Sequence, residues 1–109
     1  MTTDSTDDYP FAAEFQKAMS EVRAELQLAP GDLYEDCFFH PVVCVEVDYD
    51  NDSISGISLI DGSFPRNCSL RFCGVRKLSV AEAWEIRQHG PIDKADRDRI
   101  GVDRRWWRQ

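Results

Sequence analysis

The fold is decided by residues 42–60, which read VVCVEVDY, DNDS and ISGISLI in three successive pieces. The first piece is rich in β-branched residues and is typical of a strand. The side chains predicted to share one face of it are those of Val43, Val45, Val47 and Tyr49. The second piece is a turn, because Asp and Asn side chains bond their own backbone. The third predicts a second strand, in which Gly56 indicates a bulge or a close backbone approach. We therefore expect a β-hairpin.

Shorter strands are expected on either side of this hairpin. Leu33-Tyr34 could open the sheet, and Cys68–Cys73 and Val75–Leu78 predict two further strands around Gly74. The β core is thus expected over 31–78. We expect one α+β domain, with a small antiparallel barrel or curled sheet of four to five strands between two helices. An open sheet with both helices on one face is the alternative.

The first helix is predicted over 10–28. Its apolar residues recur at spacings of three and four and form one stripe: Ala12, Phe15, Met19, Val22 and Leu26. Pro10 suits the first turn, and Pro30-Gly31 stops the helix. The polar, acidic residues 1–8 before it are predicted to be a disordered leader.

The second helix is predicted over 79–90. Ser79 and Glu82 form a capping box at its start, in which each side chain bonds the backbone of the other residue. Gly90-Pro91 ends it, because glycine accepts the left-handed stop and proline cannot continue a helix. Residues 91–109 are predicted to form a charged tail that ends in arginines and tryptophans. Within it, residues 92–103 are either a solvated helical turn or a linker.

The order of helix, short strands and helix resembles small five-stranded barrels of the Src-homology-3-like type. The segment Pro30-Gly31-Asp32-Leu33-Tyr34 looks like the turn that opens the first strand of many such barrels. The resemblance covers residues 30–79 and implies only a fold. It implies no function, since one fold supports many unrelated functions.

The 109 residues include 13 Lys+Arg and 20 Asp+Glu, for a formal net charge of −7. Ordinary apolar content excludes a disordered chain, and no apolar run is long enough to cross a membrane. No secretory signal is recognisable, so we expect a cytoplasmic, bacterial protein with reduced thiols. Residues 1–61 hold 14 acids and 2 bases, whereas 62–109 hold 6 acids and 11 bases. The two halves could match each other or a partner.

The cysteines raise the possibility of zinc. Cys37 and His40 have a workable ligand spacing, and Cys68 with Cys73 could complete four N/S ligands. No CxxC pair is present, and Cys44 would point to another strand face. Four buried thiols with no metal are the simpler interpretation, because cysteine is a small, often buried residue. We expect no cofactor, with zinc as the alternative.

Other chemistry is weakly supported. Residues 48–52 match the first ligands of a calcium loop, but the required Gly and Glu are replaced by Ser53 and Leu59. A thiol nucleophile with His40 or His89 lacks any local signature. There is no phosphate loop. We therefore expect a protein that is not an enzyme, and rate a thiol-dependent enzyme lowest.

The leading hypothesis is a small interaction domain. Its candidate binding residues are acidic in the hairpin and basic or aromatic in the tail: Glu46, Asp48, Asp50, Asp52, Arg104, Arg105, Trp106 and Trp107. The acidic surface would dock a basic protein partner, or the basic tail of another copy in a homo-oligomer. We expect no membrane partner, disfavour nucleic acid, and expect the tail indoles to dock on the domain or on a partner copy. The alternative is a zinc-stabilised Cys/His domain.

Overall fold

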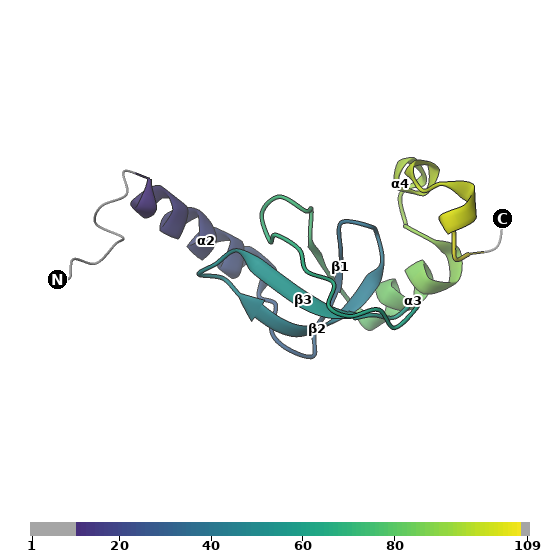
Figure 1. Ribbon diagram of the computed structural model, residues 1–109, viewed down its shortest axis with the longest axis horizontal. Coiled ribbons are helices and arrows are strands. Elements are labelled where there is room, and N and C mark those ends of the chain that lie inside the picture. Colours follow the sequence, from purple (N-terminus) through teal and green to yellow (C-terminus); the bar gives the residue numbers. More distant parts are fainter. Residues whose placement is uncertain (1–10, 108–109) are drawn as a thin grey trace.

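The computed structural model describes residues 11–107, so the expected acidic leader lies outside the described residues. The fold is α+β, as predicted, with a sheet between helices that lie toward the two ends of the chain (Figure 1). The helices are α2 (Ala12–Leu26), α3 (Val80–His89), α4 (Lys94–Arg99) and the 3-10 helix η1 (Val102–Arg104). The strands are β1 (Leu33–Glu35), β2 (Pro41–Asp48), β3 (Ser53–Ser58) and β4 (Arg76–Leu78).

The sheet is antiparallel and has the order β3-β2-β1-β4. The β2–β3 hairpin is confirmed, but the sheet stays open, so the barrel form suggested by the Src-homology-3-like resemblance is wrong. The strand predicted over 68–73 is also wrong. Only Cys68 pairs, in a bridge to Ile54. The backbone N–H groups of Arg71 and Phe72 donate to the Ser69 hydroxyl instead, which makes this segment a turn.

A β-bulge changes which face of β2 is buried. Cys44 pairs with Gly56 and Glu46 with Ser55, so Val45 is the extra residue. Before the bulge Val42 and Cys44 are buried, and after it Tyr49 is. Of the four side chains predicted to share one face, Val47 and Tyr49 lie on the face that packs on the core, whereas Val43 and Val45 lie on the opposite face.

Gly56 is required opposite this bulge. A Cβ atom there would lie 2.3 Å from the Val43 carbonyl oxygen and 2.6 Å from the Val42 side chain. The predicted close backbone approach is thus confirmed.

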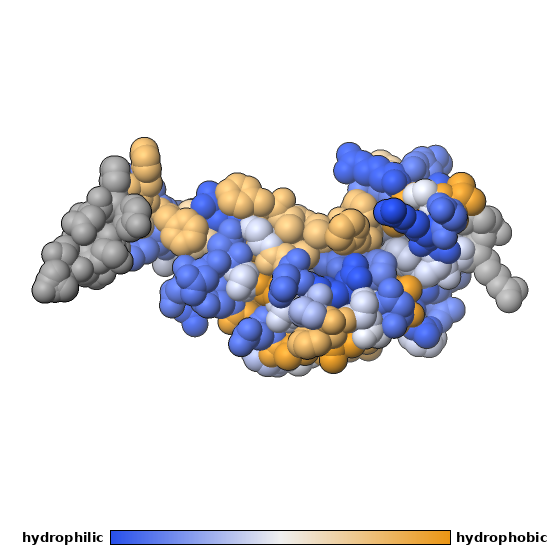
Figure 2. Space-filling view, viewed as in Figure 1, coloured by the Kyte–Doolittle hydropathy of each residue, from blue (hydrophilic) through white to orange (hydrophobic). Residues whose placement is uncertain are grey.

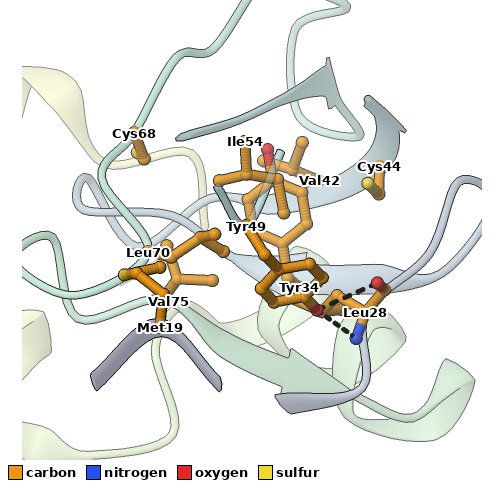
Figure 3. Packing of buried hydrophobic residues seen from close by; sticks show 10 residues of the cluster. All are labelled: Met19, Leu28, Tyr34, Val42, Cys44, Tyr49, Ile54, Cys68, Leu70 and Val75. Carbon is orange, nitrogen blue, oxygen red and sulfur yellow. Dashed lines mark hydrogen bonds between the residues drawn. The ribbon is translucent and has the colours of Figure 1, made fainter. Parts of the chain in front are cut away.

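The main core lies between the sheet, the end of α2 and the segment 68–75 (Figure 3). Tyr34, Val42 and Ile54 are almost fully buried within it. The Tyr49 hydroxyl donates to the Leu28 carbonyl oxygen (2.9 Å) and accepts from the Leu28 N–H (2.8 Å). These bonds tie the end of the hairpin to the chain that leaves α2.

Only the second half of α2 joins this core. Met19 is buried and Val22 and Leu26 are partly buried, but Phe15 is exposed and Phe11, just before the helix, is 75% exposed. The first turns project away from the sheet (Figure 1), and Figure 2 shows apolar side chains exposed on this projecting part. The predicted stripe is therefore only partly used, and the helix is shorter than the predicted 10–28.

Helix α3 matches its prediction. Ser79 Oγ accepts from the Glu82 N–H (3.1 Å) and Glu82 Oε1 accepts from the Ser79 N–H (2.8 Å), which confirms the capping box. Ala83 and Ile86 form a second buried cluster with Leu78. Trp106 packs on this cluster and its indole N–H donates to the Ile86 carbonyl oxygen (3.0 Å). At least one tail indole therefore docks on the domain.

The charge split is partly neutralised inside the molecule. Arg66 pairs with Asp36 (2.6 Å), Arg76 with Glu35 (3.6 Å) and Lys77 with Asp32 (3.6 Å). Each pair joins a base of the second half to an acid of the first. The acids of the β2–β3 turn and the arginines of 97–105 lie toward opposite ends of the molecule (Figure 1).

Candidate functional site

Three cysteine side chains from separate parts of the chain meet beside the main core. Their sulfur atoms all lie within 4.8 Å of one another, and Cys37 Sγ and Cys68 Sγ are 3.3 Å apart. Cys68 is buried, and Cys37 and Cys73 are half-buried. Two cysteine sulfurs on one tetrahedral zinc ion lie roughly 3.8 Å apart, given Zn–S distances of about 2.3 Å. The cluster is therefore of the size that three ligands of one ion require.

Cys37 is presented by a tight turn that Asp36 organises. One carboxylate oxygen, Asp36 Oδ1, accepts from the N–H groups of Phe38 (3.0 Å) and His40 (2.9 Å). The other, Oδ2, accepts from Nε of Arg66 (2.6 Å). Because the Asp36 side chain is almost completely buried, these bonds fix the turn, and with it the position of the Cys37 sulfur.

Cys68 and Cys73 lie at the two ends of the turn that replaces the predicted strand. Cys68 is held by its two backbone hydrogen bonds to Ile54. Cys73 Sγ accepts from the Ser69 N–H (3.3 Å). The turn is anchored to the hairpin by Asp52, whose carboxylate accepts from Ser69 Oγ (2.7 Å) and from the Arg71 N–H (3.0 Å).

His40, the fourth predicted ligand, and Cys44, the remaining cysteine, lie outside the cysteine cluster. His40 Nδ1 is 2.8 Å from Ser58 Oγ, and its ring makes an edge contact with Trp106. Burial, helped by the charge of Arg66, lowers the pKa of His40. Cys44 is buried in the core. The structure thus brings together three of the four predicted ligands, and the fourth, His40, is directed to a different set of contacts.

The thiols of Cys37 and Cys68 are poorly suited to act as free nucleophiles. Burial raises the pKa of Cys68 to about 12, and burial also raises the pKa of Cys37. A raised thiol pKa leaves little thiolate at neutral pH, whereas catalytic cysteines have a lowered one. A metal ion supplies the positive charge that stabilises thiolates, so this group of sulfurs suits coordination better than nucleophilic chemistry.

Of the four carboxylates in the predicted acidic surface, two are exposed and two accept hydrogen bonds from the protein itself. Glu46 and Asp50 are exposed. Asp48 accepts from the N–H groups of Asp50 and Asn51 and from the Asn51 amide, and hydrogen bonds from Asn51 lower its pKa. Asp52 anchors the cysteine turn. The carboxylates that resemble calcium ligands therefore serve largely as turn acceptors.

The basic tail borders a groove on the same side of the molecule as the Cys37 turn. Arg99, Ile100, Arg104 and Trp106 line one side of it, and its volume is about 650 Å³. Trp106 and Trp107 make an edge contact with each other, and Arg105 Nε donates to the Ile100 carbonyl oxygen (2.8 Å). The two indoles and Arg105 are half-buried and Arg104 is exposed.

Sequence reasoning missed the residues that position the thiols. Asp36 is adjacent to Cys37, and an Asp before a short aromatic pair followed by His-Pro is compatible with the Asx turn observed. The pairing of Asp52 with Ser69 joins residues 17 apart and leaves no local pattern.

Comparison with known proteins gives no relative for this chain. No family model matches it, and neither a curated protein nor a solved structure is significantly similar. Among residues 11–107, no helix is both long and apolar enough to cross a lipid bilayer.

Proposed function

We propose that the protein is a small non-enzymatic domain in which Cys37, Cys68 and Cys73 bind one soft metal ion. The observation that carries the proposal is the convergence of three sulfurs within 4.8 Å of one another from the β1–β2 turn and from both ends of the 68–73 turn. Thiolate ligands favour Zn²⁺ and Cu⁺ over harder cations. Bound to all three, the ion would tie the segment 68–75 to the sheet.

The zinc version of this domain differs from the Cys₃His site expected from sequence. Structural zinc sites are usually closed by four protein ligands. The His40 ring is engaged with Ser58 and Trp106. The proposed site therefore has three protein ligands and leaves the fourth zinc position to a solvent molecule or an external ligand, whereas Cu⁺ can be satisfied by three thiolates alone.

Titration of the reduced protein with Co²⁺ and Zn²⁺ tests the proposal. Co²⁺ bound by thiolates gives intense near-ultraviolet charge-transfer absorption, so one equivalent should produce this signal and one equivalent of Zn²⁺ should remove it. Cys73→Ser should weaken binding of both ions at least tenfold, because one of three ligands is lost. The matched control is Cys44→Ser, which changes the same residue type outside the cluster.

Two results would overturn the proposal. One is the absence of charge-transfer absorption in a folded, fully reduced protein. The other is equal loss of binding in the Cys73→Ser and Cys44→Ser variants, which would mean that the effect comes through folding. Circular dichroism of each variant establishes that it is folded before metal is added.

The second candidate function is protein interaction through the hairpin. Its specific support is that Glu46 and Asp50 are exposed near the turn of the β2–β3 hairpin, in a chain of formal charge −7. Exposed like charges attract a basic partner over long range and are screened by salt. A lysine-rich peptide is therefore the probe. Glu46→Gln with Asp50→Asn should weaken its binding at low salt, and the control is Glu21→Gln with Glu25→Gln on exposed positions of α2.

A homo-oligomer is the other form of this candidate. The acidic turn and the C-terminal arginines lie toward opposite ends of the molecule, so they could meet only between two copies (Figure 1). Such a contact should be visible by sedimentation at low ionic strength and lost at high ionic strength. A monomer at both ionic strengths would exclude it.

A further inference from the structure

The groove beside the C-terminal segment has walls of two kinds. Figure 1 shows α4 and the segment after it standing on the same side of the molecule as the β1–β2 turn. Between them lies the groove of about 650 Å³, a volume within the range of small-molecule sites. Phe38, Ile60, Ile100 and Trp106 give it apolar walls, and Arg66, Arg99 and Arg104 add guanidinium groups.

The arginines differ in how firmly they are held. The Arg66 side chain is 16% exposed and is fixed by Asp36 through Nε and by Ser63 through an Nη1 hydrogen bond of 2.7 Å. Its guanidinium lies 5.8 Å from the Phe38 ring centroid. Arg99 is mostly exposed, and its ion pair with Asp96 is long at 3.9 Å. Arg104 is exposed on η1. One guanidinium is thus preorganised, and two more can close on a ligand.

The apolar wall is also preorganised. Trp106 is held by its indole hydrogen bond to Ile86 and by its contact with the His40 ring. Phe38 is 62% exposed, so one ring can contact a ligand without rearrangement of the core. Asp61 is the acidic side chain among the lining residues, and Asp36 is already paired with Arg66. The charge balance of the lining residues therefore favours an anion.

We propose that this groove binds a small organic anion that carries an aromatic ring. The ring would lie against Phe38 and Trp106, and the anionic group would be held by Arg99 and Arg104, with Arg66 beneath. Guanidinium groups suit phosphate and carboxylate oxygens equally, so the shared chemistry is an oxyanion joined to a flat apolar group. This site goes beyond the proposed metal function. Cys37 also lines the groove, but the oxyanion is assigned to the arginines.

The test is a titration of the full chain, with and without one equivalent of Zn²⁺, with phenyl phosphate, followed by the indole N–H signals in the NMR spectrum. The Trp106 signal should shift, and the signal of Trp84, which lies outside the groove, should not. Phenol and inorganic phosphate each carry half of the proposed ligand and should bind at least tenfold more weakly. Benzoate in place of phenyl phosphate distinguishes a carboxylate ligand from a phosphate ligand.

The variants are Arg99→Gln and Arg104→Gln, which change exposed side chains. Each should weaken phenyl phosphate binding at least threefold, and the double variant at least tenfold. Lys94→Gln, on the exposed surface of α4 outside the groove lining, is the matched control for the change in charge. Equal affinity for phenyl phosphate and inorganic phosphate, or equal loss in Lys94→Gln, would overturn the proposal. A Trp106 signal unmoved by phenyl phosphate and by benzoate would also overturn it, even where the metal titration succeeds.

Discussion

The acidic β2–β3 turn and the cysteine cluster use their polar side chains in opposite ways. In the turn, Asp48 accepts hydrogen bonds from residues two and three positions later. In the cluster, Cys37 meets Cys68 across 31 positions of sequence. The hydrogen bonds of Asp48 therefore form between neighbouring residues alone, whereas the cluster exists only once the sheet and the 68–73 turn are in place. A short-range pattern can explain the first and cannot explain the second.

The largest expected effect comes from filling the cluster. If the proposed ion binds the folded state alone, an excess of Zn²⁺ of about 1,000 times the dissociation constant adds about 4 kcal/mol to the free energy of unfolding. The melting temperature should therefore rise by about 10 °C or more. Differential scanning calorimetry with Zn²⁺ and with a chelator measures the difference.

The Cys73→Ser variant is the control for that measurement. Its melting temperature should respond much less to Zn²⁺, while Cys44→Ser should keep most of the wild-type response even where its metal-free stability is lower. An equal response in wild type and Cys73→Ser would mean that Zn²⁺ stabilises the protein elsewhere.

A smaller effect is expected at Asp52, which belongs to both regions. Asp52→Asn retains a residue that tolerates the positive φ of 52° at this position. It weakens the bonds to Ser69 and Arg71, so the free energy of unfolding should fall by about 1 kcal/mol. Metal affinity should fall as well, because the turn that carries Cys73 loses its anchor.

Asp50→Asn supplies the comparison for Asp52. Asp50 is exposed. The Asp50→Asn substitution removes the same charge from the same turn as Asp52→Asn, but it should leave metal affinity unchanged. Chemical denaturation and the Co²⁺ titration measure the two quantities. If both variants lower metal affinity equally, the loss of a negative charge is responsible and not the loss of the Asp52 hydrogen bonds. The hairpin turn would then not support the cysteine cluster.

The smallest effect concerns a second local carboxylate, Asp61. Hydrogen bonds from the Ser63 side chain and from its backbone N–H lower the pKa of Asp61 to about 2. Because the folded pKa is the lower one, this contribution to stability is present above the ordinary pKa of Asp and is lost as the pH falls toward 2. Ser63→Ala should raise the pKa of Asp61 in an NMR titration, with little change in melting temperature. An unchanged pKa would show that Ser63 is not its cause.

The same contrast explains what could be predicted from the sequence. The hairpin and the capping box of Ser79 and Glu82 were predictable because each depends on residues close together in the chain. The bulge at Val45 was not, because it is defined by the residue opposite, Gly56, and the glycine alone does not give the register. The bulge places Val47 on the same face as Val42 and Cys44, so that Val43 and Val45 lie on the opposite face.

For the candidate site, the residue types and their spacing predicted four metal ligands, and three of these lie together in the structure. Cys37, Cys68 and Cys73 were named as ligands, but the place of His40 depends on its bond to Ser58, 18 residues away. The prediction of a strand over 68–73 is wrong because the side chains of Ser69 and Asp52 accept from backbone N–H groups that a strand would bond to its neighbour. Such competition between distant side chains is invisible to periodicity.

The projecting first turns of α2 have a mechanical consequence. A helix of 15 residues is about 22 Å long, and the part before Met19 contributes no fully buried side chain. The first turns of α2 are therefore a projecting helical arm that adds no fully buried side chain to the core. A tag or a fused protein placed at this end should leave the folding of the sheet undisturbed.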